Sequence, residues 1–224
     1  MKTKALILLP SYFFLILVGP AIFLLLGSSL AELPMAIMAC MAIMLVIALL
    51  LYKDIIKENW LRLKKEENLV KFFLICLLGF VLVALVRTVL LSALSDHINF
   101  ESLGQNQQAV QEITNSIPWY GSFFMLVIFA PIVEELVFRE ALIGVVDKDN
   151  KWLLVLMTIL SIFLFTGAHM TTLADAILYL PLTLLIIYFY WRYHRNVAAS
   201  IGFHMFNNLI AWLVMTFLPN LADF

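Results

Sequence analysis

Seven apolar segments, each about 20 residues long or longer, follow one another along the chain. An α-helix needs about 20 consecutive apolar residues to cross the hydrocarbon core of a bilayer. The pattern therefore predicts an all-α, polytopic membrane helix bundle with about seven transmembrane helices. The expected spans are 5–26, 33–52, 72–94, 117–146, 152–170, 172–191 and 197–217.

The first apolar segment follows the sequence MKTK and could be taken for a signal peptide. Its apolar stretch of about 22 residues is longer than a signal core, and no small-residue cleavage pattern follows it closely. We interpret it as the first span. Seven spans use about 140 positions, so residues 1–224 are predicted to form a single integral membrane domain without a folded extramembrane part.

Composition supports this interpretation, since 64% of the 224 residues are hydrophobic and 13% are charged, with a mean hydropathy of +1.02. A water-soluble globule of this size could not cover so much apolar surface. We expect lipid as the principal partner and a place integral to the cell membrane. The net charge of −1 argues against nucleic acid. Cys40 and Cys76 both lie within apolar runs, so neither a disulfide framework nor a thiolate metal site is predicted.

Basic residues predict the orientation of the bundle. All of the 14 Lys and Arg residues except Arg87 and Arg139 fall in segments that face the same side in a seven-span arrangement. Because cytoplasmic loops carry an excess of Lys and Arg, this asymmetry predicts a cytoplasmic N-terminus and an extracytoplasmic C-terminus.

Titratable groups inside predicted spans are costly and therefore mark candidate functional sites. They cluster in the fourth, fifth and seventh spans, within the sequences PIVEELVFRE, FTGAH and HMFNN, while Arg87 stands alone in the third span and Asp175 lies near the outer end of the sixth. Glu135 and Arg139 are four residues apart on a helix and can pair, whereas Glu134 lies about 100° further round and stays available. His204 and Asn208 have the same spacing and present an imidazole and an amide side by side.

These spans thus offer a free carboxylate, two imidazoles and a carboxamide that could converge. A carboxylate can take a proton from water while His and Asn donors stabilise an oxyanion. EELVFR fits EExxxR, FTGAH fits FxxxH and HMFNN fits HxxxN, in that order and on separate spans. The chain resembles the CPBP family, which comprises CAAX proteases and bacteriocin-processing enzymes and is also called the Abi family. The resemblance covers Glu134 to Asn208, within a motif-bearing core at 117–217.

The resemblance implies an intramembrane endopeptidase that hydrolyses a peptide bond in a membrane-associated or small secreted peptide. Glu134 would activate the hydrolytic water, and His169 would help to hold it. His204 and Asn208 would polarise the scissile carbonyl and stabilise the tetrahedral intermediate. The family's bacterial roles are the processing of signalling peptides or bacteriocin leaders and immunity to bacteriocins, which suggests a bacterial plasma membrane. Cleavage of prenylated proteins would apply only in a host that prenylates them.

Glu135 and Arg139 match the family motif and are predicted to be structural support. Family members have been described both as metalloproteases and as metal-independent glutamate proteases. We expect no tightly held metal, because no HExxH is present and three separate helices would supply the ligands. If a divalent metal such as zinc is bound, Glu134, His169 and His204 are its expected ligands.

Two other functional classes compete with the protease. The first is a non-catalytic membrane scaffold or bacteriocin-immunity protein of the same family, which would not need the motif positions that this chain retains. The second is a small proton-coupled transporter, for which inverted repeats and interrupted helices in matching halves would be expected. No such repeat is evident in the sequence.

Several placements remain alternatives. Asn207 could take the role given to Asn208. Arg87 is predicted to be a counter-ion for Glu135 or Glu140, with a peptide carboxylate as the alternative partner. Asp175 is predicted to be a solvated residue at the edge of the bundle. Straight helices would also place His169 and His204 at different depths, so tilt, a longer stretch before the fifth span or a kink at Pro131 would have to bring them together.

Overall fold

The computed structural model describes residues 2–27, 29–97 and 103–218, and every regular element in these ranges is a helix. Seven helical runs are long and apolar enough to cross a membrane, which confirms the predicted all-α polytopic bundle. They are Lys2–Leu25, Leu30–Glu66, Leu69–Ala93, Trp119–Gly144, Lys151–Ala168, Leu173–Arg192 and Val197–Phe217.

Several of these runs combine α-helix with shorter 3₁₀ or π segments, labelled η. In chain order the elements are α1 (Lys2–Phe13), η1 (Phe14–Val18), α2 (Gly19–Leu25), η2 (Leu30–Glu32), α3 (Leu33–Glu66), α4 (Leu69–Ala93), η3 (Ser95–His97), α5 (Gln105–Ser116), α6 (Trp119–Phe123), η5 (Phe124–Phe129), α7 (Ala130–Glu135), η6 (Leu136–Gly144), α8 (Lys151–Ala168), η7 (Leu173–Asp175), α9 (Ala176–Arg192) and α10 (Val197–Phe217). The fourth span is therefore the continuous run from α6 to η6, and π segments flank α7 on both sides.

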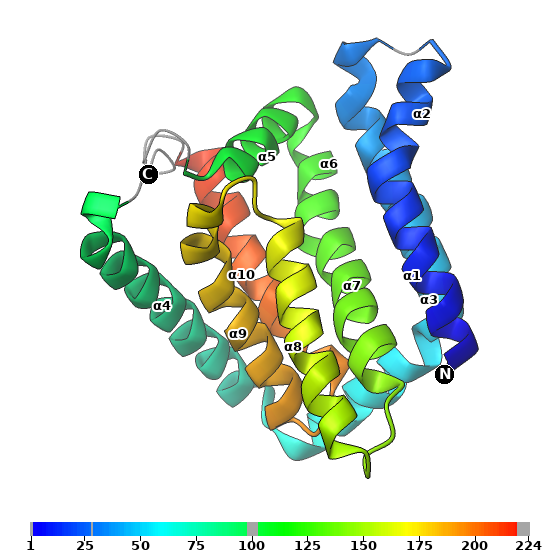
Figure 1. Ribbon diagram of the computed structural model, residues 1–224, viewed down its shortest axis with the longest axis vertical. Helices are drawn as coiled ribbons and strands as arrows, with labels where there is room; N and C mark the ends of the chain where they lie inside the picture. The colour runs from blue at the N-terminus through cyan, green and yellow to red at the C-terminus, as the bar shows by residue number, and fades with distance from the viewer. Residues whose placement is uncertain (1, 28, 98–102, 219–224) are drawn as a thin grey trace.

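The helices form a central bundle with two flanks (Figure 1). The α6–η6 run, α8, α9 and α10 lie together, with α1 and α3 on one side and α4 on the other. α4 packs mainly on α9, whereas α1 packs on η6 and α3. The elements that carry the three sequence motifs therefore lie in the middle of the bundle.

Two helical segments lie outside the spans that hydropathy predicts. The second span was expected at 33–52, but α3 continues to Glu66 as an amphipathic helix that buries Asn59 and Leu63. In Figure 1 this second half of α3 runs across one end of the bundle. We call this end, which also holds the loop before α8 and the turn between α9 and α10, the basic end. α5 is a polar helix at the opposite end that was not predicted, because only one side of it is apolar.

The turn between α9 and α10 is tied to the basic end by hydrogen bonds. Asn196 caps α10 by accepting from the backbone N–H of Ala198 and Ala199, and its amide donates to the Asn59 carbonyl at 2.9 Å. The backbone N–H of Val197 donates to Asn59 Oδ1 at 3.0 Å. These bonds fix the start of α10 against α3, and with it the position of every later residue on α10.

Gly79 allows α4 to approach the aromatic core of the bundle. Phe189 and Phe203 stack with ring centroids 4.3 Å apart, and both are fully buried. A Cβ added at Gly79 would lie 2.9 Å from Phe203 Cε2. The close approach of α4 therefore requires glycine at this position.

We predict that Gly79→Ala destabilises the protein by about 1–3 kcal/mol, because the stacked rings cannot move aside without losing contacts. Gly167→Ala, near the end of α8, is the control, since a Cβ there meets nothing within 4 Å and alanine is also the better helix former there. Thermal unfolding of both variants in one detergent measures the difference. Equal unfolding midpoints would contradict the close packing of α4.

Candidate active site

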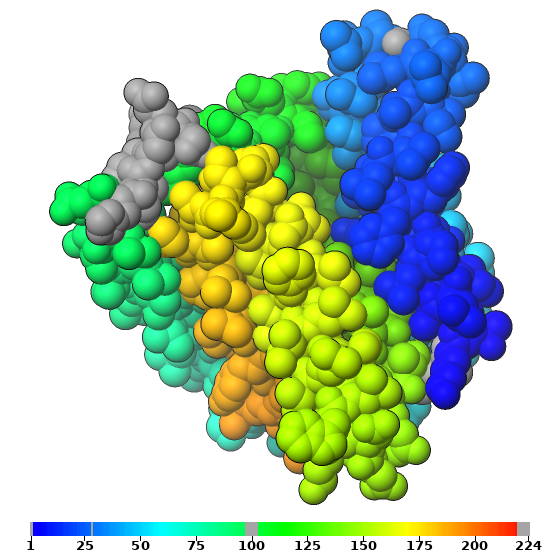
Figure 2. Space-filling view, in the orientation of Figure 1, coloured from blue at the N-terminus to red at the C-terminus, as the bar shows by residue number. Residues whose placement is uncertain are grey.

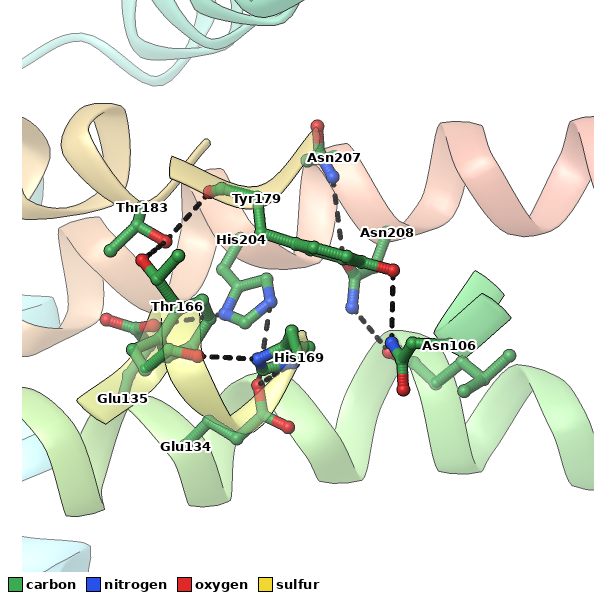
Figure 3. A network of polar contacts seen from close by, with 12 residues as sticks. Asn106, Glu134, Glu135, Thr166, His169, Tyr179, Thr183, His204, Asn207 and Asn208 are labelled. Carbon is green, nitrogen blue, oxygen red and sulfur yellow. Dashed lines mark hydrogen bonds and ion pairs between the residues drawn. The ribbon is translucent and has the colours of Figure 1, made fainter. Parts of the chain in front are cut away.

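Glu135 is the centre of a buried ionic network. Its carboxylate lies 3.2 Å from Arg139 Nε through Oε2 and 3.0 Å from His204 Nδ1 through Oε1 (Figure 3). The side chains of Glu135 and Arg139 are completely buried, and that of His204 is 3% exposed. An unpaired charge would be very costly in such an environment, so the Arg139 guanidinium and the His204 Nδ1–H stabilise the carboxylate, and the carboxylate in turn orients His204.

Glu134 lies on the neighbouring position of α7 and takes no part in this pairing. Its Oε2 is 3.9 Å from His169 Nε2 and 3.8 Å from His204 Nε2. Its side chain is 10% exposed, in contrast to the complete burial of Glu135. The α7, α8 and α10 elements thus bring one accessible carboxylate and two imidazoles together (Figure 3).

His169 ends α8 and is held from three sides. Its Nδ1 is 2.8 Å from the Phe165 carbonyl, one helical turn earlier. Its ring packs between the rings of Phe165 and Tyr179, at centroid distances of 4.7 and 5.4 Å. These contacts fix an imidazole that would otherwise lie at a frayed helix end.

The hydrogen bonds also determine the tautomers of the two histidines. The Nδ1 atoms face a carbonyl oxygen and a carboxylate oxygen, which only accept, so in the neutral form each Nδ1 carries the proton. Each Nε2 then presents a lone pair toward Glu134. The distances of 3.8 and 3.9 Å are too long for direct hydrogen bonds, so Glu134 is near both imidazoles without being bonded to either of them.

Phe165 links the buried ionic network to both histidines. The guanidinium of Arg139 lies over its ring, 4.3 Å from the centroid. The same ring meets His204 edge to face at 5.6 Å. Arg139 therefore contributes a cation–π contact as well as an ion pair, and Phe165 restrains His169 and His204 together.

A stagger between helices reduces the difference in depth between His169 and His204. Ser161, in the middle of α8, donates to the carbonyl of Phe138 in η6, so the first half of α8 extends past the basic end of η6. α10, in contrast, begins level with that end, because Arg195 donates to the carbonyls of Ile143 and Gly144. This overhang of α8 is one of the three contributions that the sequence left open.

Asn208 of α10 forms a structural hydrogen bond with a backbone carbonyl of η5. The π register of η5 bonds the Ala130 N–H to the Met125 carbonyl, and the following residue, Pro131, has no N–H to give to the Leu126 carbonyl. Asn208 Nδ2 donates to that carbonyl at 3.0 Å. Its second N–H is left for another acceptor, so a structural role and a role toward a substrate do not exclude each other.

The metal-binding potential of the three groups can be judged from their spacing. Tetrahedral zinc with bonds of about 2.0–2.2 Å holds its ligand atoms about 3.3–3.5 Å apart. The Glu134–His169 and Glu134–His204 separations of 3.9 and 3.8 Å are wider, although both imidazoles carry the Nδ1–H bonds that metal-ligating histidines have. In the described part of the chain no group of three or more His, Cys, Asp or Glu has metal-binding geometry. The donor types suit a metal, but the observed spacing does not.

Comparison with known proteins places the chain in a family. The family model described as type II CAAX prenyl endopeptidase Rce1-like matches residues 116–210, which include all three motifs. The UPF0177 protein YbdI of Lactococcus lactis subsp. lactis (strain IL1403) is 31% identical over 141 residues, 61% of this chain and 74% of the relative. The chain belongs to the CPBP family.

Two further relatives come from the same organism. UPF0177 protein YbdJ is 27% identical over 186 residues, 80% of this chain and 74% of the relative. UPF0177 protein YajF is 30% identical over 115 residues, and that match spans 55% of the relative's length. No solved structure matches the chain.

Of the motif residues, Glu134, Glu135, Arg139, His169 and His204 lie together, whereas Asn208 contacts the Leu126 carbonyl and Asn207 instead. The sequence analysis did not identify two other residues near the site. Tyr179 contacts His169 and is held through its hydroxyl by Asn106 of α5, at 3.0 Å. Asp175 is fully buried rather than solvated, and it accepts from the backbone N–H groups of Thr172 and Gly104. In the sequence, Thr172 and Asp175 have the spacing of a capping box, which could have indicated this turn.

The predicted pairing of Arg87 with Glu135 or Glu140 is wrong. The carboxylate of Glu135 is paired with Arg139 and His204. Among the described residues, Arg87 forms no ion pair with Glu135 or Glu140. α4 flanks α9 rather than α7, so Arg87 lies within electrostatic reach of Tyr179 instead. Helical spacing alone could not indicate which helices are neighbours.

The site opens toward one face of the molecule. His169 is 23% exposed at its side chain, the most of the five charged or titratable side chains above. Figure 2 shows a hollow between α2 and the upper part of α8, with the green α6–η5 region as its floor. Among these side chains, that of His169 is therefore the most accessible from outside the bundle.

We predict that Asn208→Leu destabilises the protein by about 1–3 kcal/mol, because the Leu126 carbonyl then lacks a donor inside an apolar span. Asn207→Leu is the matched control. Its Oδ1 is buried without a hydrogen-bond partner in the described structure, so its loss costs less. Thermal unfolding in detergent tests the pair, and an equal loss in both variants would argue against the Asn208–Leu126 bond.

Proposed function

We propose that the chain is an intramembrane endopeptidase that hydrolyses a peptide bond in a membrane-associated or small secreted peptide. The observation that carries the proposal is the largely buried Glu134 carboxylate, whose Oε2 is 3.8 and 3.9 Å from two imidazole nitrogens within an apolar bundle. Membership of a family of the CAAX protease type supports it. We further propose a bacterial plasma membrane as its location, with the basic end in the cytoplasm.

In the proposed reaction, Glu134 takes a proton from a water molecule that His169 helps to hold. The water oxygen bonds to the scissile carbonyl carbon, and the carbonyl oxygen becomes an oxyanion. Glu134 then passes its proton to the leaving amine as the C–N bond breaks. The products are a carboxylic acid and an amine, so the proton and the electron pairs balance and Glu134 is regenerated as a carboxylate.

His204 is proposed to stabilise the oxyanion. When its Nε2 is protonated, the positive charge is balanced by Glu135, which contacts its Nδ1 at 3.0 Å. Arg139, whose Nε is 3.2 Å from the Glu135 carboxylate, supports that carboxylate in this role. The free N–H of Asn208, one turn further along α10, is the second proposed donor. No step of the proposed reaction requires a metal ion.

We predict that Glu134→Gln lowers peptide cleavage by about 10²–10⁴-fold, because the amide cannot accept the proton from water. The purified full-length protein is incubated with a library of proteome-derived peptides and with peptides ending in a prenylated CAAX sequence, and new termini are read by mass spectrometry. Glu66→Gln, an exposed residue of α3, is the control.

Unchanged cleavage by a folded Glu134→Gln variant would reject the proposed base. The same assay is run with a chelator, and loss of activity that zinc restores would replace the metal-free scheme by a metal-dependent one. If the wild type produces no new termini, and a Glu134→Gln/His204→Ala variant still protects cells against a bacteriocin, the alternative of a non-catalytic scaffold or immunity protein is favoured.

We also predict distinct effects for two substitutions of Tyr179. Tyr179→Leu removes the ring that packs on His169, and misplacing the imidazole should lower kcat by about tenfold or more with little change in KM. Tyr179→Phe keeps the ring and loses only the Asn106 hydrogen bond, so kcat should stay within about threefold of the wild type. Equal losses in both variants would show that Tyr179 does not act by positioning His169.

A further inference from the structure

Arg87 is a charged side chain within a span that the candidate active site leaves without a role. It lies on α4, about 9 Å before the end of the span Leu69–Ala93 at a rise of about 1.5 Å per residue. Ionisable residues inside a span are costly and as a rule serve a function. Among the described residues, Arg87 forms no ion pair and no hydrogen bond.

The guanidinium of Arg87 is enclosed at its base only. Its Nε has no accessible surface and no hydrogen-bond partner in the described structure. Nη1 and Nη2 are not enclosed in this way, and the residue as a whole is half-buried. The end of the side chain is therefore accessible to a ligand, while its base is surrounded by the protein.

Tyr179 connects Arg87 to the candidate active site. The Tyr179 ring packs on His169, with centroids 5.4 Å apart. Its hydroxyl accepts from Asn106 Nδ2 at 3.0 Å and lies within electrostatic reach of Arg87. α4 packs on α9, the helix that carries Tyr179, and this packing fixes the position of Arg87. Arg87 is thus separated from an imidazole of the site by a single side chain.

The carboxylate of Asp175, at the start of the same span as Tyr179, does not neutralise Arg87. Both of its oxygens accept hydrogen bonds from the turn that it caps. The donors are the N–H groups of Gly104, Thr171 and Thr172 and the hydroxyl of Thr171. Arg87 therefore keeps a positive charge that no described carboxylate pairs with.

An accessible, unpaired guanidinium in an apolar bundle favours a planar anion with two oxygens. A carboxylate accepts two parallel N–H···O bonds from an arginine, and these charge-assisted bonds are stronger than neutral ones. Asn106 Nδ2 carries two N–H groups, of which one donates to Tyr179, so the other is available as a further donor. A peptide at the candidate active site carries such groups at its C-terminus and on Asp and Glu side chains.

We propose that Arg87 forms a subsite that binds a carboxylate of the peptide substrate, either the terminal carboxylate or an acidic side chain. This subsite rests on the proposed peptidase function and names the feature by which a substrate is selected. The rings of His169 and Tyr179 separate Arg87 from Glu134. In an extended peptide, at about 3.3 Å per residue, the bound carboxylate is therefore expected about two to four residues from the scissile bond.

The test compares cleavage of a proteome-derived peptide library by the wild type and by Arg87→Gln, both as purified full-length proteins. New termini are read by mass spectrometry, and the cleaved peptides are aligned at the scissile bond. The wild type should favour peptides with a carboxylate at one distance from that bond, and Arg87→Gln should lose this preference. Arg192→Gln, which removes an exposed arginine at the basic end, is the control and should keep the preference in full.

Arg87→Lys serves as a second variant and covers the case in which Arg87→Gln does not fold. It retains the charge but not the two-bond geometry, so the preference for a carboxylate should become weaker without disappearing.

Two synthetic versions of the most rapidly cleaved library peptide identify the source of the carboxylate. One version has an amidated C-terminus, and in the other Asn or Gln replaces the acidic residue at the favoured distance. For the wild type, the version that lacks the bound carboxylate should have a KM about tenfold or more higher, with kcat within about threefold of the parent peptide. Arg87→Gln should not distinguish that version from the parent peptide.

Each result decides between the subsite and the peptidase function. Cleavage by the wild type without any carboxylate preference would overturn the subsite and leave the peptidase function standing. An unchanged preference in an Arg87→Gln variant that unfolds at the wild-type temperature would do the same. Absence of cleavage that depends on Glu134 would reject the peptidase function, and the subsite with it.

Discussion

The site depends on the buried carboxylate of Glu135. Within an apolar bundle water cannot supply the missing hydrogen bonds of a charged group, so the protein must supply them. Arg139 and His204 do so from two helices, and the pairing brings α10 against the fourth span at the level of the site. Phe165 packs on the guanidinium and on the imidazole, which joins α8 to the same point. One ionic interaction therefore organises three helices.

Two adjacent glutamates serve different purposes because the helix turns by about 100° between them. Glu135 points into the fully enclosed network, whereas Glu134 points to the side where His169 is partly exposed. Because it points to this other side, Glu134 has two imidazole neighbours but no fixed counter-ion. A carboxylate in that position can exchange a proton, and a carboxylate in the position of Glu135 can orient a neighbour.

Hydropathy and helical spacing predict part of this arrangement. The spans follow from the length of their apolar runs, and the Glu135–Arg139 pair follows from a spacing of four residues on one helix. The contacts of His204 and Tyr179 could not be derived, because they join helices whose neighbours and relative depth are set by packing. α5 was missed for a related reason, since its apolar side is too narrow to stand out in a hydropathy pattern.

The capped turn before α10 has a consequence for changes in chain length. Asn196 and Val197 are bonded to Asn59, so the first residue of α10 has a fixed rotational setting. One residue inserted between Val197 and His204 would rotate the imidazole by about 100° and advance it by about 1.5 Å, away from Glu135. Insertions beyond Phe217 would leave the rotational position of His204 unchanged. α10 therefore tolerates variation in length at one end and not at the other.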